Sequence, residues 1–287
     1  MEIRLVLPNK GRLYEPTLEL LSRAGFILLE RDERALYART SDPDLSIIFV
    51  RAADIPKFVE SEAADLGITG FDYICESRAK VREILDLDFG RARIVLAAHE
   101  RFGIRTLEDI ASNTRIATKL PVITEEFLAE NKKKASIVKI SGAAEIMPHI
   151  GVADMIVDTM STGTTLKTHG LAIVSEVLQS SARLIANESS LISKDSKINE
   201  LALAFESVIR ATKKKLIMMN VPEANLEAVV KTIPSMSGPT LAKVESETPM
   251  WEVYSVIDEK EIYRVINQAK KAGARDILVL PIERIIP

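Results

Sequence analysis

The chain has 287 residues, of which 47% are hydrophobic and 28% charged, with a formal net charge of -3 and a pI near 5.8. This is the composition of a globular protein long enough for two or three domains, without the positive charge of most nucleic-acid-binding proteins. The single cysteine, Cys75, excludes an internal disulfide. No apolar run approaches the roughly 20 residues of a membrane helix, and the N-terminus does not read as a signal peptide. We therefore expect a cytoplasmic protein whose partners include neither nucleic acid nor membrane.

Strands and helices alternate through the first ninety residues. The apolar runs that predict strands are 3–7, 45–50 and 65–69. A helix is expected at 15–24, because Gly25 is a natural stop, and a second helix is expected to be capped by Asp54. The inward face of this second helix would be Ile55, Phe58, Val59 and Ala63.

A second α/β unit follows. Its predicted strands are 93–98, 115–118, 137–140 and 155–158. Its predicted helices are a short one with a capping box of Thr106 and Asp109, one after Pro121, and one at 143–150. This alternation predicts mainly parallel sheets covered by helices.

The two units echo each other in sequence. In 64–70 and again in 153–159, Ala-Asp leads into an apolar strand that ends at a small polar residue. The echo is either a recurring helix-to-strand connection or a duplicated lobe. In both cases two similar lobes create a cleft at the carboxyl ends of their strands, where open α/β sheets bind ligands.

The last eighty or so residues follow a different plan. Strands are predicted at 216–221, 240–245, 251–257 and 277–282, and helices at 224–231 and after Asp258. The order βαββαβ is that of a ferredoxin-like unit, and a module of this kind without a catalytic constellation is more often regulatory or structural. The candidate linker into it is 187–210.

The segment 155–166 carries the strongest chemical signal. A buried strand delivers Asp158 at its end, and the chain then turns through hydroxyl residues around one glycine. The hydroxyls and backbone N–H groups of such a turn can hold a phosphate, and the acid can accept hydrogen bonds from ribose hydroxyls. The alternative is a helix N-terminus that is merely rich in Ser and Thr. The predicted phosphate-binding residues are Ser161, Thr162, Gly163, Thr164 and Thr165.

A cationic turn follows the first strand. Lys10 and Arg12 flank Gly11, and Arg51 at the end of the 45–50 strand would lie on the same rim. Three cations at strand ends suit a triphosphate or diphosphate. A solvated surface turn is the alternative.

Other candidates are weaker. Gly67 to Asp72, which includes Gly70, offers a close backbone approach and an acid, and Glu145 is either a helix-terminus partner or a cleft residue. No Ser-His-Asp arrangement, paired-carboxylate motif or Walker loop is present, and no metal ligands can be assigned. The three histidines are scattered in the sequence and are expected to be structural or surface residues. They are His99, His149 and His169.

Several of these segments resemble one known family. The loop 158–166 resembles the phosphoribosyl pyrophosphate loop of the ATP phosphoribosyltransferases, which catalyse the first step of histidine biosynthesis. The segments 10–12, 67–72, 117–118 with Pro121, and 142–145 resemble that family in the same order. The closing module, with Pro239-Thr240, is similar to the regulatory domain of the long form. Common phosphoribosyltransferases carry two adjacent acids before the loop, whereas Val157 precedes Asp158 here, as in the histidine-pathway enzymes.

The resemblance implies an α/β fold with a bilobal catalytic part like the periplasmic binding proteins and a C-terminal ferredoxin-like βαββαβ regulatory domain. Lobe I would comprise 1–92 with 180–209, lobe II 93–179, and the regulatory domain 210–287. It implies transfer of the phosphoribosyl group to ATP with release of diphosphate, a requirement for Mg²⁺, and assembly of dimers into hexamers. L-Histidine would be a feedback inhibitor.

The resemblance also implies roles for individual residues. Asp158, Lys10 and Arg12 would be catalytic, and the loop hydroxyls would hold the 5-phosphate. The expected ATP and diphosphate residues are Lys10, Gly11, Arg12, Arg51, Gly70, Asp72 and Glu145, and the expected histidine-binding residues are Ser237, Thr240, Leu241 and Ala274. Two rival readings are a bilobal small-molecule binding protein and a phosphoribosyltransferase that uses a free nucleobase.

Overall fold

The computed structural model describes residues 2–29, 36–160, 166, 168–234 and 238–286. The chain divides into two compact units, Met1–Ala202 and Leu203–Pro287. In the described part of the chain, no helix is both long enough and apolar enough to cross a membrane.

The first unit contains a seven-stranded sheet with the order β2-β3-β4-β1-β5-β12-β6. Its three central strands, β4, β1 and β5, are parallel, and the outer pairs are antiparallel. Strand β1 is buried except for Arg4, as expected for a strand covered on both faces. The strands are β1 (Ile3–Pro8), β2 (Leu28–Leu29), β3 (Tyr37–Thr40), β4 (Leu45–Val50), β5 (Leu66–Gly70), β6 (Arg82–Asp86) and β12 (Ala182–Ala186).

Three helices accompany this sheet: α1 (Tyr14–Arg23), α2 (Ile55–Glu60) and α3 (Phe71–Ser77). The inward face predicted for α2 is only half right, because Ile55 and Val59 are buried whereas Phe58 and Ala63 are exposed. The helix ends at Glu60, and Glu62 adopts a φ of +59°, so the chain leaves the helical path before Ala63.

The second sheet has the order β11-β7-β10-β8-β9. Its strands are β7 (Ala92–His99), β8 (Arg115–Thr118), β9 (Ser136–Lys139), β10 (Met155–Met160) and β11 (Leu171–Ser180), and its helix is α4 (Pro121–Glu130). The capping box of Thr106 and Asp109 is confirmed at η2 (Leu107–Asp109), which follows η1 (Glu100–Phe102). The helix predicted at 143–150 is wrong: the structure has only the turn η3 (Ala144–Ile146). Ala143 has a left-handed φ of +53°, and Pro148 cannot donate to a helical ladder.

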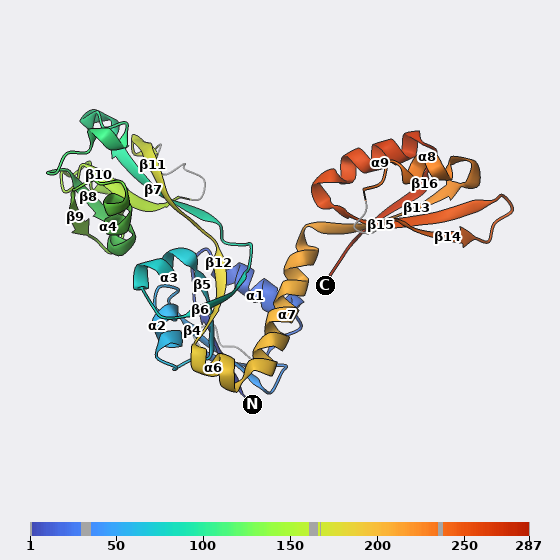
Figure 1. Ribbon diagram of the computed structural model, residues 1–287, viewed down its shortest axis with the longest axis horizontal. Helices are drawn as coiled ribbons and strands as arrows, with labels where there is room; N and C mark the ends of the chain where they lie inside the picture. Colours follow the sequence, from blue (N-terminus) through green and yellow to red (C-terminus); the bar gives the residue numbers. More distant parts are fainter. Residues whose placement is uncertain (1, 30–35, 161–165, 167, 235–237, 287) are drawn as a thin grey trace. The chain divides into compact units, whose positions relative to one another are not determined.

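Two chain crossings join the sheets, and with the antiparallel strands β2, β3 and β4 they make the sheets mixed rather than mainly parallel. The first crossing leads from β6 to β7, and the second leads from β11 to β12. Strands β7 and β11 run side by side and antiparallel, with Ala92 opposite Ser180 (Figure 1). Because β11 and β12 bring the chain back, each sheet contains antiparallel strands that the helix-strand alternation alone did not predict.

The echoed Ala-Asp segments occupy equivalent places in the two sheets. The Asp65 carboxylate accepts a hydrogen bond of 2.8 Å from the backbone N–H of Arg4 in β1. The Asp154 carboxylate accepts one of 2.9 Å from the N–H of Arg115 in β8. In both lobes the aspartate thus links the beginnings of two neighbouring parallel strands. The two segments are therefore alike in their contacts as well as in sequence.

The segment predicted as the linker, 187–210, is helical, and the boundary between the two units, after Ala202, falls within it. Asn187 caps α6 (Glu188–Ser193) by accepting from the Ser190 N–H, and α7 (Asp195–Thr212) follows directly. Of the polar residues in this stretch, Glu188, Ser189 and Ser193 are exposed, whereas Asn187 and Ser190 are buried. The buried residues of α7 include Ile198, Leu201, Phe205, Val208 and Ala211.

The second unit confirms the expected ferredoxin-like βαββαβ order. Its antiparallel sheet has the order β14-β15-β13-β16, and both main helices cover one face (Figure 1). Val229, Val265 and Ala269 on the helices pack into one core with Ile217 and Val253 on the strands. The elements are β13 (Lys214–Pro222), η4 (Glu223–Asn225), α8 (Leu226–Val230), β14 (Thr240–Val244), β15 (Met250–Asp258), η5 (Glu259–Glu261), α9 (Ile262–Lys271) and β16 (Arg275–Pro281).

Candidate active site

The carboxyl ends of β4, β1 and β5 are neighbours in the first sheet, and they bring the predicted cationic segments together. The N–H of Asn9 donates to the carbonyl of Val50 at 2.8 Å, so Lys10 and Arg51 follow adjacent strands at the same edge. Both side chains are exposed. The sequence prediction that Arg51 shares a rim with the Lys10 turn is therefore met by the strand pairing.

Arg12 lies in a different environment from Lys10. Its guanidinium forms an ion pair of 2.9 Å with Asp72, whose side chain is 1% exposed. Asp72 follows β5 in α3, and Gly70 lies so close that a Cβ there would stand 2.2 Å from the Asp72 carboxylate. The structure thus joins three of the predicted residues, Arg12, Gly70 and Asp72, in one buried cluster.

At the second sheet, Asp158 lies near the carboxyl end of β10, next to the parallel strand β8. Lys119, the residue that follows β8, places its Nζ 3.0 Å from the Asp158 carboxylate. Sequence reasoning missed Lys119, although a lysine directly after a strand is the same signal that singled out Lys10 and Arg51. The pair leaves the acid 21% and the lysine 37% exposed, so both can reach a ligand.

The predicted phosphate-binding residues, Ser161, Thr162, Gly163, Thr164 and Thr165, lie outside the described residues. The residues on either side are described. Met160 and Leu166 are 5% and 7% exposed and belong to one core cluster with Ala144. Both ends of the loop are therefore anchored in the hydrophobic core of the second sheet. Glu145, which is partly buried, directly follows Ala144 in the chain.

Buried polar atoms without partners mark the same regions. Among the described residues, three buried side-chain oxygens lack a hydrogen-bond partner: Asn9 Oδ1, Asp72 Oδ2 and Thr159 Oγ1. Such atoms are rare in folded proteins and call for a ligand or a bound water. Each of the three lies in a segment that contains a candidate site residue, at or just beyond a strand's carboxyl end.

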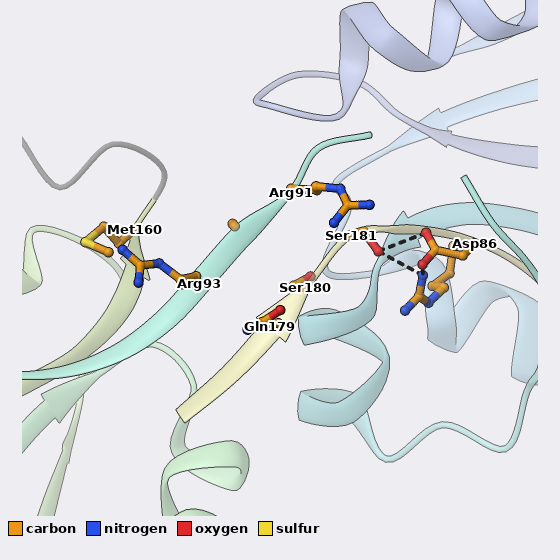
Figure 2. Close-up of a pocket in the computed structure, with 9 residues that line it drawn as sticks. Asp86, Arg91, Arg93, Met160, Gln179, Ser180 and Ser181 are labelled. Carbon is orange, nitrogen blue, oxygen red and sulfur yellow. Dashed lines mark hydrogen bonds and ion pairs between the residues drawn. The ribbon is translucent and has the colours of Figure 1, made fainter. Parts of the chain in front are cut away.

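A cavity of about 350 Å³ lies at the two crossings between the sheets. Its lining includes Arg91, Arg93 and Arg183, with Met160 from the base of the loop (Figure 2). Arg183 pairs with Asp86. Burial alone would raise the pKa of Asp86, but hydrogen bonds from the Asp88 N–H, Arg183 and Ser181 bring it below its usual value.

The three histidines, scattered in the sequence, gather in space. The rings of His99 and His149 are 4.8 Å apart and those of His149 and His169 are 5.8 Å apart. His149 Nε2 lies 3.1 Å from the His169 carbonyl oxygen. Burial and the neighbouring His149 and Arg101 lower the pKa of His99. Nevertheless, the described part of the chain contains no group of three or more His, Cys, Asp or Glu side chains arranged to hold a metal ion.

Strand-end cations on one lobe, and an acid with a lysine beside a hydroxyl-rich loop on the other, are features of an enzyme that transfers a phosphorylated ribose. Comparison with known proteins agrees. The family model for ATP phosphoribosyltransferase matches residues 51–207, and that for the "HisG, C-terminal domain" matches residues 211–284. The chain belongs to the ATP phosphoribosyltransferase family, in its long form with the C-terminal domain.

Individual relatives support the same assignment. The chain is 51% identical over 285 residues to an ATP phosphoribosyltransferase of Ignicoccus hospitalis, covering 99% of this chain and 100% of that protein. It is 49% identical to one of Methanocella arvoryzae, with 99% of each chain covered. A solved structure of the ATP phosphoribosyl transferase (HisG:HisZ) complex from Thermotoga maritima matches with a TM-score of 0.61 and 27% identity. This match covers 71% of the present chain and 98% of that chain.

Proposed function

We propose that this enzyme condenses ATP with 5-phosphoribosyl 1-diphosphate in the cytoplasm. The products are N1-(5-phosphoribosyl)-ATP and diphosphate. The observation that carries the proposal is the Lys119–Asp158 pair at the base of the loop 161–165, beside a neighbouring strand. A carboxylate at this place can orient ribose hydroxyls, while a lysine can neutralise phosphate charge.

The reaction needs no general base, because N1 of adenine attacks C1 of the ribose with its own lone pair. The chain's task is therefore to align the two substrates and to stabilise the departing diphosphate and the positive charge that develops on the ribose. Ser161 to Thr165 would hold the 5-phosphate, and Asp158 would orient the ribose. Lys10, Arg51 and Lys119 would neutralise the polyphosphates, with Glu145 close to the loop.

Mg²⁺ would enter with its substrate. Magnesium in such sites is commonly bound by phosphate oxygens, waters and one or two carboxylates rather than by a protein cage. That preference fits the described residues, among which Asp158 is the strand-end carboxylate nearest the loop and no larger ligand cluster occurs. The ion would neutralise charge on the diphosphate.

A single assay tests the reaction. The purified protein is mixed with Mg²⁺, phosphoribosyl pyrophosphate and one of several acceptors, and the release of diphosphate is followed. The proposal expects release with ATP and none with free adenine, guanine or uracil. Release with a free base and not with ATP would show that a free base, rather than ATP, is the acceptor. The absence of release with every acceptor would refute the proposed activity.

The C-terminal unit invites a regulatory role, in which L-histidine inhibits the enzyme. The predicted histidine-binding residues lie at two different places in its sheet. Thr240 and Leu241 are exposed on β14, which is one edge of the sheet, and Ala274 precedes β16, which is the other edge. Ser237 lies outside the described residues. One copy of the sheet therefore does not bring these residues together, and a shared pocket would require a second copy of the chain.

The exposed apolar side chains of β16 support such self-association. Leu278, Val279 and Leu280 are 58%, 39% and 40% exposed on an edge strand, which is a surface that proteins usually cover. We propose that copies associate through the C-terminal units into dimers and hexamers and that histidine binds between them. Histidine should inhibit diphosphate release and increase the sedimentation coefficient together. Inhibition that persists in a Val279→Glu variant shown to be monomeric would contradict an interfacial site.

A further inference from the structure

A polar cluster of the first unit lies at the two crossings between the sheets. We call it the hinge network and define it as the side chains of Arg12, Asp72 and Ser180 with the carbonyl of Gly90. Each member comes from a different segment: the Lys10 turn, the start of α3, the second crossing and the first crossing. The role inferred for it rests on the proposed function, in which the Lys10 turn binds the polyphosphate of ATP.

The contacts show that Arg12 ties the turn to both crossings. Its Nη2 donates to the Asp72 carboxylate at 2.9 Å and to Ser180 Oγ at 3.5 Å, and its Nε donates to the Gly90 carbonyl at 3.2 Å. Ser180 Oγ donates to Asp72 at 2.6 Å and accepts from the Asp72 N–H at 3.1 Å. The Ser180 hydroxyl thus donates to Asp72 and accepts from both the Asp72 N–H and Arg12.

Two glycines show how little space the network leaves. A Cβ at Gly70 would stand 2.2 Å from the Asp72 carboxylate and 3.1 Å from Arg12 Nη2. Gly90 has a φ of +59°, and a Cβ there would stand 2.2 Å from Leu13, the residue after Arg12. A side chain at either position would push the segments apart. Glycine at these two positions therefore allows the backbone to approach closely.

The three side chains of the network differ in exposure. Asp72 and Ser180 are 1% and 4% exposed, and the Arg12 side chain is 26% exposed. Lys10, two residues from Arg12, is exposed. Arg12 thus donates from Nε and Nη2 to groups of the protein, while Lys10 is exposed to solvent.

We infer that Asp72 and Ser180 are positioning residues, which act through Arg12 to hold the Lys10 turn in register with the two crossings. The crossings are the only covalent connections between the sheets in the described chain, so a change in their backbone reaches the turn through this network. The turn is thereby kept in place for the polyphosphate of ATP, while Met160 and Leu166, which flank 161–165, pack into the core of the other sheet.

The test compares two adjacent serines of the second crossing. Ser180→Ala removes the hydroxyl from the network. Ser181→Ala is the matched control, because Ser181 donates to Asp86 at 2.9 Å and accepts from Arg183 at 2.8 Å without contacting Arg12. We expect Ser180→Ala to raise the KM for ATP about tenfold while the KM for phosphoribosyl pyrophosphate changes less than about twofold, since a tenfold change corresponds to one strong hydrogen bond. Ser181→Ala should leave both KM values unchanged.

A second variant guards against a general loss of structure. Ser180→Thr retains the hydroxyl and should restore most of the affinity for ATP. Equal effects of the two alanine variants on both substrates would overturn the positioning role, as would a rise in KM for ATP that Ser180→Thr does not reverse. A wild-type protein that releases no diphosphate with ATP would instead refute the proposed function, so the two failures are distinguishable. Thermal unfolding of each variant confirms that it is folded.

Discussion

Lys119 Nζ lies 3.0 Å from the Asp158 carboxylate, so the acid expected to orient the ribose already has a cationic partner. Asp158 and Lys119 each directly follow a member of the last parallel pair of β10 and β8, Val157 and Thr118, so the strand register brings them together. A bound phosphoribosyl pyrophosphate can share both groups, its hydroxyls with the acid and its phosphates with the lysine. We therefore expect the pair to act as a single binding unit.

Replacing Lys119 by Met should raise the KM for phosphoribosyl pyrophosphate about tenfold, because a charge-assisted contact to phosphate contributes roughly 1.5–3 kcal/mol. Steady-state kinetics at saturating ATP measure the change. Lys134→Met is the matched control. Lys134 is exposed and precedes β9, so it lies at the amino end of a strand parallel to β8, whereas Lys119 lies at the carboxyl end of β8. The same rise in KM for both variants would contradict a specific role for Lys119.

Replacing Thr164 by Val should also weaken the binding of phosphoribosyl pyrophosphate. The position lies in the segment that the sequence predicts to hold the 5-phosphate, and Val keeps the shape of Thr while removing the hydroxyl donor. We expect a severalfold higher KM with an unchanged melting temperature. An unaltered KM would remove Thr164 from the proposed site.

Replacing Asp65 by Asn should lower the free energy of unfolding by about 2–3 kcal/mol at pH 7, because the buried carboxylate has several donors to satisfy. It accepts from Arg4, Ser190 and Lys194. Burial alone would raise the pKa of Asp65, but these hydrogen bonds bring it below its usual value of 3.8. The stabilisation by the charged form is therefore present above pH 3.8 and is lost as the pH falls through the lower folded-state pKa.

Urea unfolding at several pH values measures this difference. The stability gap between wild type and Asp65→Asn should be largest near neutral pH and should narrow below pH 3.8. Glu130→Gln, a change at an exposed residue of α4, should alter stability by less than about 0.5 kcal/mol. A stability difference that widens as the pH falls would contradict the prediction, because it would mean that the charged carboxylate does not stabilise the folded state.

The Cys75 thiol should react slowly with alkylating agents. Burial, with the nearby Glu83, Glu126 and Asp72 carboxylates, raises its pKa from 9.0 to about 11. At pH 8 the reactive thiolate is then about 100-fold less populated than in the unfolded chain, since each pKa unit is a factor of ten. Alkylation by iodoacetamide should be slower by at least that factor in the native protein than in urea. Equal rates would show that the thiol is neither buried nor shifted.

Local patterns in the sequence determined much of this protein. The strands of both sheets that end at candidate residues, the capping box at Thr106 and the closing βαββαβ order were all predictable, because periodicity, caps and turns depend on residues close together in the chain. The family resemblance came from the same kind of information, through the hydroxyl-rich segment after Asp158. The placement of Lys10 beside Arg51 also followed, since parallel strands end at one edge.

Only the tertiary structure decided which distant residues meet. The pairing of Asp158 with Lys119, the gathering of three histidines and the network of Arg12, Asp72 and Ser180 all join segments far apart in the chain. They depend on strand order and on the two crossings, and neither of these produces a periodic pattern in the sequence. The segment 187–210 shows the same limit: its composition indicated a connection between two units, but only the structure shows that this connection is helical and that one face of α7 is buried.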